Sequence, residues 1–160
     1  MFASFIDSVK YVGHLFPVAF LRIYMGYFYL QQALLKFNGD FLARPRLASE
    51  IADVLPGLNA PAWYKVMVEK MVIQHWQSFA FVVLGLEFMI AISYLLGYVV
   101  RPVAIVGVFI SVNYLILLSN GSDDLFRTFI AVHLIMAWMG AGRCLGFDYY
   151  FFKRRRGIWW

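Results

Sequence analysis

Four polar side chains lie deep inside apolar segments of this sequence, where they could bind a ligand or transfer a proton. Arg22 and Glu87 each lie near the middle of a long hydrophobic run, and Asn113 and His133 lie at comparable depth in two further runs. An ionisable side chain at the centre of a bilayer costs about 2.5–3.5 kcal/mol on insertion scales, so it normally has a partner or faces a wet cavity. Because Arg22 and Glu87 carry opposite charges, we expect them to meet inside a helical bundle.

The meeting of Arg22 and Glu87 has three interpretations. The first is a buried ion pair that fixes the register of two helices. The second is a polar pocket that binds an anion or the carbonyl group of a quinone, and one pair can serve both purposes. The third is a contact of either side chain with lipid headgroups.

Asn113 and His133 have a structural and a functional interpretation as well. An isolated Asn at this depth is most often a hydrogen-bonding contact between helices. His133 is either a neutral, hydrogen-bonded histidine or a group that binds quinone or moves a proton, because imidazole changes its charge near physiological pH. A haem held by two histidines would need a second mid-membrane His, and His14 and His75 lie near segment ends.

The sequence contains no spacing typical of a metal or nucleotide site. Its three His, its single Cys144 and its scattered acidic residues form no ligand pattern. A P-loop, a GxGxxG fingerprint and a nucleophile elbow are also missing from the sequence. We therefore expect neither metal nor flavin in this chain, and redox chemistry would need a bound quinone or another protein subunit.

The composition predicts an integral membrane protein. Of the 160 residues, 62% are hydrophobic and 14% are charged, whereas soluble domains are about 45–50% apolar and about 25% charged. The net charge of +5 does not indicate nucleic-acid binding, because the basic residues gather at segment ends, as topology signals in membrane proteins do.

Four apolar runs must position these side chains. A membrane-spanning helix needs about 20 residues, within a range of about 17–25. The runs cover residues 15–35, 77–97, 102–119 and 126–142. Residues 38–76 contain short stretches of helical spacing that cap the bundle or lie in the membrane interface. The fold class is therefore all-α integral membrane: a four-transmembrane-helix bundle with an amphipathic helical first loop, in one domain over residues 1–160.

Charge placement predicts the orientation of the bundle. Lys10, Arg101 and the basic tail at 149–160 favour a cytoplasmic location for both termini, in the inner membrane of a bacterium. The basic residues of the first loop would favour the opposite orientation. Residues 1–14 resemble a short interfacial helix rather than a cleaved signal peptide, and residues 119–124 are typical of a turn.

Three motifs follow one another along the chain: LRIYMGYFYLQQALLKF, GLEFMIAISYLLGYVVRP and GAGRCLGFD. This ordered set, over about residues 15–148, resembles the DoxX/DoxD-like family of small four-helix membrane proteins. Gln31 and Gln32 depart from the family pattern, which usually has a small residue before the lysine. The motif residues are Arg22, Gly26, Lys36, Glu87, Gly97, Arg101, Gly142, Arg143 and Asp148.

The resemblance implies a function linked to redox chemistry. Members of the family include the membrane subunit of a thiosulfate:quinone oxidoreductase and proteins that associate with superoxide dismutase and a sulfurtransferase. It further implies that Arg22 and Glu87 are the intramembrane polar pair, and that Arg143 and Asp148 organise the cytoplasmic end.

We therefore expect the membrane subunit of a quinone-linked redox system, linked to sulfur compounds or to oxidative stress. Arg22 and His133 would donate to quinone carbonyls, Glu87 would relay protons, and a second protein subunit would supply electrons. The alternative is a non-catalytic scaffold or assembly subunit of a larger membrane complex, in a homo- or hetero-oligomer. A third option, a small transporter or channel, rests on the acidic residues Asp123 and Asp124.

Overall fold

The protein is represented by a computed structural model that describes residues 13–58, 60–117 and 123–154. Most of the expected helix over 1–14 lies outside these residues, and so does Lys10. The end of the basic tail, from residue 155, lies outside them as well. Most of the expected turn at 119–124 lies outside them too.

Every regular element in the described residues is a helix, and this part of the chain contains no strand, which confirms the all-α class. Four helices are long and follow the predicted runs closely: α2 (Phe16–Asn38), α5 (Trp76–Leu96), α6 (Val100–Leu117) and α7 (Asp123–Met139). Short elements connect and flank them: η1 (Gly13–Leu15), α3 (Arg46–Val54), η2 (Leu55–Gly57), α4 (Ala62–Met67), the π-helical turn η3 (Val68–Ile73), η4 (Ala141–Arg143) and α8 (Asp148–Arg154).

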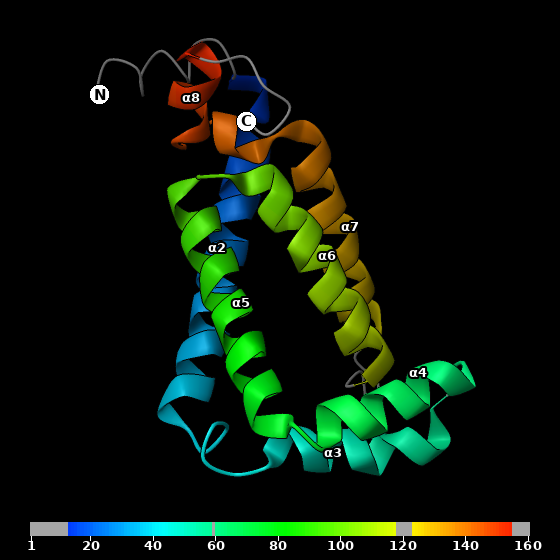
Figure 1. Ribbon diagram of the computed structural model, residues 1–160. Helices are drawn as coiled ribbons and strands as arrows, with labels where there is room; N and C mark the ends of the chain where they lie inside the picture. Colours follow the sequence, from blue (N-terminus) through cyan, green and yellow to red (C-terminus); the bar gives the residue numbers. More distant parts are fainter. Residues whose placement is uncertain (1–12, 59, 118–122, 155–160) are drawn as a thin grey trace.

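The four long helices alternate in direction and form a bundle (Figure 1). α2 packs along α5, α6 packs along α7, and α5 joins the two pairs through α6. The short helices α3 and α4 lie at the loop end of the bundle, and η4 and α8 lie at the opposite, closing end (Figure 1). The first loop is therefore helical, as predicted.

Small residues bring the helices together in the core. A Cβ atom at Gly26 of α2 would lie 2.9 Å from the backbone nitrogen of Leu95 on α5, so the two helices touch through their backbones. Ala91 on α5 and Ala104 on α6 are fully buried in the same core. Close approach through small residues is the usual packing mode of helices in membranes.

Two of the helices in the described residues, α5 and α6, are long and apolar enough to cross a membrane, as judged by length and composition alone. α2 is interrupted by Arg22, Gln31, Gln32 and Lys36. α7 has 17 residues and carries two aspartates in its first turn. These polar positions and the short length explain why only two helices meet the criterion in the described chain.

Candidate functional site

Arg22 and Glu87 do not meet, so the predicted ion pair is wrong. The guanidinium of Arg22 is fully buried at the closing end. Its Nη1 donates to the backbone oxygens of Ala141, at 2.7 Å, and Cys144, at 3.0 Å, and its Nη2 donates to that of Leu145, at 2.8 Å. These carbonyl groups lie in the tight turns after α7, where regular helical hydrogen bonding has ended and partners must come from elsewhere.

Asp148 completes this closing end from the other side. Its two carboxylate oxygens accept hydrogen bonds from the backbone nitrogens of Val99, at 2.7 Å, and Val100, at 3.1 Å. These donors lie at the start of α6, where a helix leaves its first N–H groups unpaired and favours a negative charge. Burial raises the pKa of the Asp148 carboxyl, and the two backbone hydrogen bonds act in the opposite direction.

The turn between α5 and α6 requires glycine next to Arg22. Gly97 has a φ of 65°, in the left-handed region that glycine adopts without strain. A Cβ atom there would lie 2.6 Å from Nη1 of Arg22 and 2.6 Å from the Cα of Gly146. Side-chain hydrogen bonds to the backbone thus hold the closing end together. Neither Arg22 nor Asp148 lines one of the cavities described below.

Two further motif residues lie at this end. The Nη2 of Arg101 donates to the backbone oxygen of Trp138, at 3.4 Å. The guanidinium of Arg143 lies 4.0 Å from the ring centroid of Phe152, the geometry of a cation–π contact.

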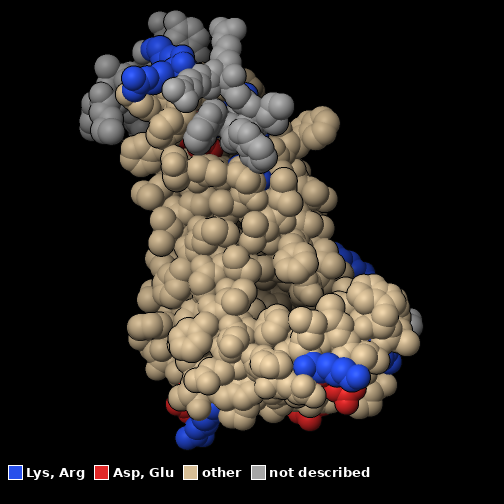
Figure 2. Space-filling view, in the orientation of Figure 1, with Lys and Arg blue, Asp and Glu red and all other residues tan. Residues whose placement is uncertain are grey.

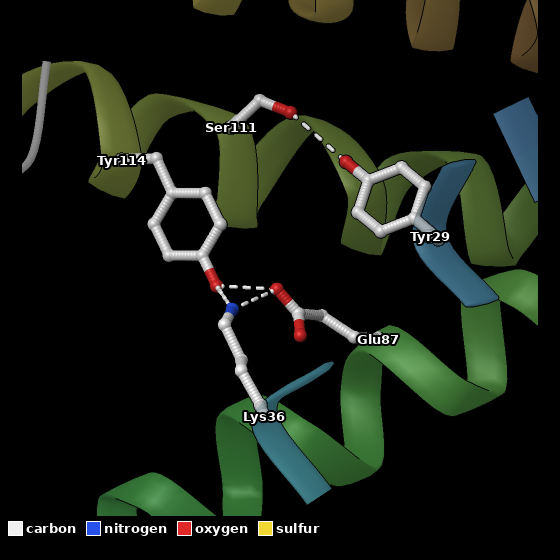
Figure 3. Close-up of polar contacts among 5 residues, drawn as sticks. All are labelled: Tyr29, Lys36, Glu87, Ser111 and Tyr114. Atoms are coloured by element: carbon white, nitrogen blue, oxygen red, sulfur yellow. Dashed lines mark hydrogen bonds and ion pairs between the residues drawn. The ribbon is translucent and has the colours of Figure 1, made fainter. Parts of the chain in front are cut away.

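Glu87 has a different cation as its partner, Lys36 from the end of α2. Its Oε1 accepts hydrogen bonds from the Lys36 Nζ and from the Tyr114 hydroxyl, the latter at 2.6 Å (Figure 3). The Lys36 Nζ also donates to the Tyr114 hydroxyl at 2.9 Å. The three side chains come from α2, α5 and α6 and form one polar cluster, the Lys36–Glu87–Tyr114 cluster.

The cluster is largely buried, and one of its hydrogen-bond acceptors has no partner among the described residues. The side chain of Glu87 is 2% exposed and that of Lys36 is 22% exposed. The second carboxylate oxygen of Glu87, Oε2, has no hydrogen-bond partner among the described residues. A buried carboxylate oxygen normally has one, so this atom is an acceptor that the described side chains leave unused.

A pocket of about 330 Å³ opens onto this cluster, and we refer to it as the polar pocket. This volume lies within the usual range for small-molecule sites. Aromatic rings supply much of its wall, and Phe28 and Phe129 meet edge to face across the seam between α2 and α7, with centroids 5.0 Å apart. The pocket is lined by Phe28, Tyr29, Gln32, Lys36, Glu87, Tyr114, Leu125, Phe126 and Phe129.

His133 lies behind the polar pocket rather than in its wall. Its Nε2 lies 2.9 Å from the hydroxyl of Tyr29, and its Nδ1 lies 2.5 Å from that of Tyr94. A neutral imidazole has one donor and one acceptor nitrogen, so one tyrosine donates to the ring and the other accepts from it. Tyr29 also lies 3.5 Å from the Ser111 hydroxyl (Figure 3). Among the described hydrogen bonds, the one to Tyr29 is therefore the link between His133 and the pocket.

Asn113 is also separate from the polar pocket. Its amide donates to the backbone oxygen of Phe109 at 2.7 Å and accepts from the Tyr64 hydroxyl at 3.1 Å, which connects α6 to α4. Burial raises the pKa of the Tyr64 hydroxyl, which therefore stays a donor.

Of the four polar residues predicted to form a site, only Glu87 lines the polar pocket. Lys36, expected only as a motif residue, is its charge partner. Gln32 was singled out only as a departure from the family pattern, and Tyr29 and Tyr114 were missed as pocket residues. The signal of the two tyrosines was weak because aromatic residues make up 19% of the sequence and tyrosine is common in membrane proteins. Among the described residues, no group of three or more His, Cys, Asp and Glu could hold a metal ion.

Comparison with protein-family models, with curated proteins and with solved structures gave no match. The resemblance to the DoxX/DoxD-like family therefore stays a prediction drawn from the motifs.

Proposed function

We propose that this chain is a four-helix integral membrane protein, in which α2 and α7 cross the bilayer together with α5 and α6. Charged side chains gather toward the two ends of the face in Figure 2, and most of the surface between them is uncharged. Large apolar side chains are exposed on the long helices, including Phe20, Ile105 and Trp138 at 56%, 63% and 87%. Soluble monomers rarely expose apolar surface on this scale.

Basic residues support the proposed orientation. Arg101, Arg143, Lys153 and Arg154 lie at the closing end, which would then face the cytoplasm of a bacterium across its inner membrane. The loop end carries charges of both signs, including the exposed pair of Arg44 and Asp40.

Within this bundle, the polar pocket is proposed to bind the ring of a quinone in a redox system with a second protein subunit. The Lys36–Glu87–Tyr114 cluster, exposed to an aromatic-lined pocket, is the observation that carries the proposal. A quinone offers a flat apolar ring with carbonyl acceptors, and its reduction takes up two protons. The pocket matches these needs with aromatic walls and with donors on Lys36 and Gln32, and the carboxylate of Glu87 lies in the same cluster.

The cluster assigns separate tasks to its residues. Lys36 is the donor to a ring carbonyl, in place of Arg22, because an ammonium has three protons and two of them are used by Glu87 and Tyr114. Glu87 holds the ammonium in place and would accept from a ring hydroxyl at Oε2 after a rotation of its carboxylate, because Oε2 is buried without a ligand. Tyr114 fixes both groups from α6, so their geometry is set before a ligand arrives.

Titration of the full chain in lipid nanodiscs with a short-chain ubiquinone and a short-chain menaquinone tests this proposal. Saturable binding is expected, weakened about 10- to 100-fold in Lys36→Gln, since a hydrogen bond to a charged group contributes about 1.5–3 kcal/mol. Lys70→Gln removes an exposed cation at the loop end and is the matched control. A lack of saturable binding, or equal binding by Lys36→Gln, contradicts the proposal.

The closing end favours a second candidate, a non-catalytic scaffold or assembly subunit. Arg22 and Asp148 use their charged groups on the backbone of this chain, which stabilises the bundle and requires no ligand. A scaffold would keep its fold and its protein partner when Lys36 and Glu87 are both replaced by methionine. A quinone protein would keep the fold and lose quinone binding.

The transporter option loses its support. Arg127 lies 3.7 Å from a carboxylate oxygen of Asp123 and 3.5 Å from one of Asp124. The acidic residues at the start of α7 are thus partly neutralised by their own helix.

A further inference from the structure

A second cavity, of about 360 Å³, lies between α5, α6 and the helices of the first loop, and we refer to it as the apolar cavity. The face shown in Figure 2 is hollowed between α5 and α6, above the loop helices. A dry cavity of about 150 Å³ is enough to bind benzene, so this one can hold a considerably longer apolar group. Its lining residues are Leu47, Ile51, Tyr64, Met67, Val68, Met71, Val72, Phe79, Val82, Val83, Leu86, Phe109, Ile110, Asn113, Tyr114 and Leu117.

The chemistry of the lining selects a hydrocarbon. Among the described residues that line the cavity, none is charged, and only Tyr64, Asn113 and Tyr114 carry polar side-chain atoms. Those atoms already form hydrogen bonds inside the protein: Tyr64 with Asn113, Asn113 with the Phe109 backbone, and Tyr114 with Glu87. A polar ligand would lose its bonds to water here and gain few in return, whereas an alkyl chain loses nothing.

The mouth of the apolar cavity is on the outer face of the bundle. Val82 on α5, Phe109 on α6 and Met71 on η3 line it and are 55%, 66% and 54% exposed. In the proposed membrane orientation this face contacts lipid. Met67 and Met71 are flexible and polarisable, so the wall they form can adapt to a chain of variable shape.

Tyr114 separates the apolar cavity from the polar pocket, because its side chain lines both. Its hydroxyl is held by Lys36 and Glu87 on the polar side. A tail attached to a ligand in the polar pocket would have to displace this ring, whereas a lipid can enter directly between α5 and α6. We therefore expect the apolar cavity to hold a different molecule from the one in the polar pocket.

We propose that the apolar cavity binds one acyl chain of a bilayer phospholipid, which enters between α5 and α6 and lies over the loop helices. The inference rests on the proposed membrane location and is independent of quinone binding. A bound chain would pack α3, α4 and η3 against the bundle, where the contacts to α5 and α6 otherwise leave a void.

A photoactivatable phosphatidylcholine with a diazirine in one acyl chain tests this proposal in nanodiscs that hold the full chain. Peptide mapping by mass spectrometry should find adducts on Met67, Met71 and Val83 about tenfold above those on Ile105, an exposed residue of α6 outside the cavity. Val83→Trp fills the cavity and should abolish this enrichment, whereas Ile105→Trp, the matched control, should keep it.

Even labelling of cavity residues and outer faces in the unaltered protein overturns the proposal, as does enrichment that survives Val83→Trp. Leu86→Trp fills the same cavity and replaces Val83→Trp if that variant does not fold. Failure of the unaltered chain to insert into nanodiscs would instead contradict the membrane location. Loss of quinone binding in Lys36→Gln with unchanged labelling would show that the two sites are separate.

Discussion

Lys36 at the end of α2 and Glu87 in the middle of α5 form a buried ion pair that Tyr114 of α6 completes. This contact joins three of the four long helices at one point. It also leaves Oε2 of Glu87 without a partner, beside the polar pocket. The same residues therefore join the helices and line the polar pocket, where we propose that a ligand binds. The two roles can be separated by comparing variants that replace Lys36 or Glu87 alone with a variant that replaces both.

The first prediction concerns this double replacement. Lys36→Met leaves a buried carboxylate unpaired and should lower the free energy of unfolding by about 3 kcal/mol, near the lower end for a broken buried pair because Lys36 is partly exposed. Lys36→Met with Glu87→Met should recover most of this loss, since two apolar side chains of similar volume are tolerated. Thermal unfolding followed by size-exclusion chromatography measures both variants.

Arg127→Met is the control for the ion-pair measurement. It breaks exposed contacts with Asp123 and Asp124 and should change stability by less than about 1 kcal/mol. A double variant as unstable as Lys36→Met alone would show that the charges are needed for more than their mutual attraction.

The second prediction concerns Arg22. Arg22→Lys keeps the positive charge but loses the planar fork that donates to three carbonyl oxygens. We expect the free energy of unfolding to fall by about 2–4 kcal/mol, which is the contribution of one or two hydrogen bonds to a charged group. Arg46→Lys, at an exposed position, is the control.

An exchange of charges distinguishes the observed geometry from an Arg22–Glu87 pair. Arg22→Glu combined with Glu87→Arg should be at least as unstable as either single variant, because the two sites do not touch. Recovery of expression and thermal stability by this exchange would contradict the structure.

The helices themselves follow from the sequence, whereas the pairing of their charges does not. Apolar runs of sufficient length predict helices whatever their neighbours. Pairing depends on the level at which two helices meet. Gly26 lies against Leu95, and α2 and α5 run antiparallel, so Arg22 lies level with the turn at Gly97 and Lys36 lies level with the region of Glu87.

The antiparallel arrangement alone would not have identified the right partner. Matching the ends of the predicted runs 15–35 and 77–97 places Arg22 about level with residue 90 and Lys36 about level with residue 76, so it favours Arg22 as the partner of Glu87. The contact of Gly26 with Leu95 shifts this register along α5, and the sequence carries no signal for that shift. The carbonyl partners of Arg22 carry no signal either, because any residue can supply a backbone oxygen. The apolar cavity could not be predicted from the sequence either, because its walls consist of common apolar residues from separate segments of the chain.

The third prediction concerns the closing turn. Gly97→Ala places a methyl group at a φ of 65° and against the guanidinium of Arg22. We expect the free energy of unfolding to fall by more than about 1 kcal/mol, because alanine is disfavoured in this backbone conformation and the added methyl group has no space. Gly85→Ala, inside α5 with nothing within 4 Å of the new Cβ, should be neutral or raise stability by about 0.5–1 kcal/mol. Equal melting temperatures for the two variants would contradict the described turn.

The fourth prediction separates ligand binding from stability at His133. Tyr29→Phe and Tyr94→Phe each remove one hydrogen bond to the imidazole, at Nε2 and Nδ1, and each should cost about 1 kcal/mol of stability. Only Tyr29 lines the polar pocket. Titration with the short-chain quinones should therefore show weaker binding in Tyr29→Phe and unchanged binding in Tyr94→Phe. If both variants bind as the unaltered protein does, the Tyr29 hydroxyl has no part in the site; if both lose binding equally, His133 acts on the pocket through the packing of the core rather than through Tyr29.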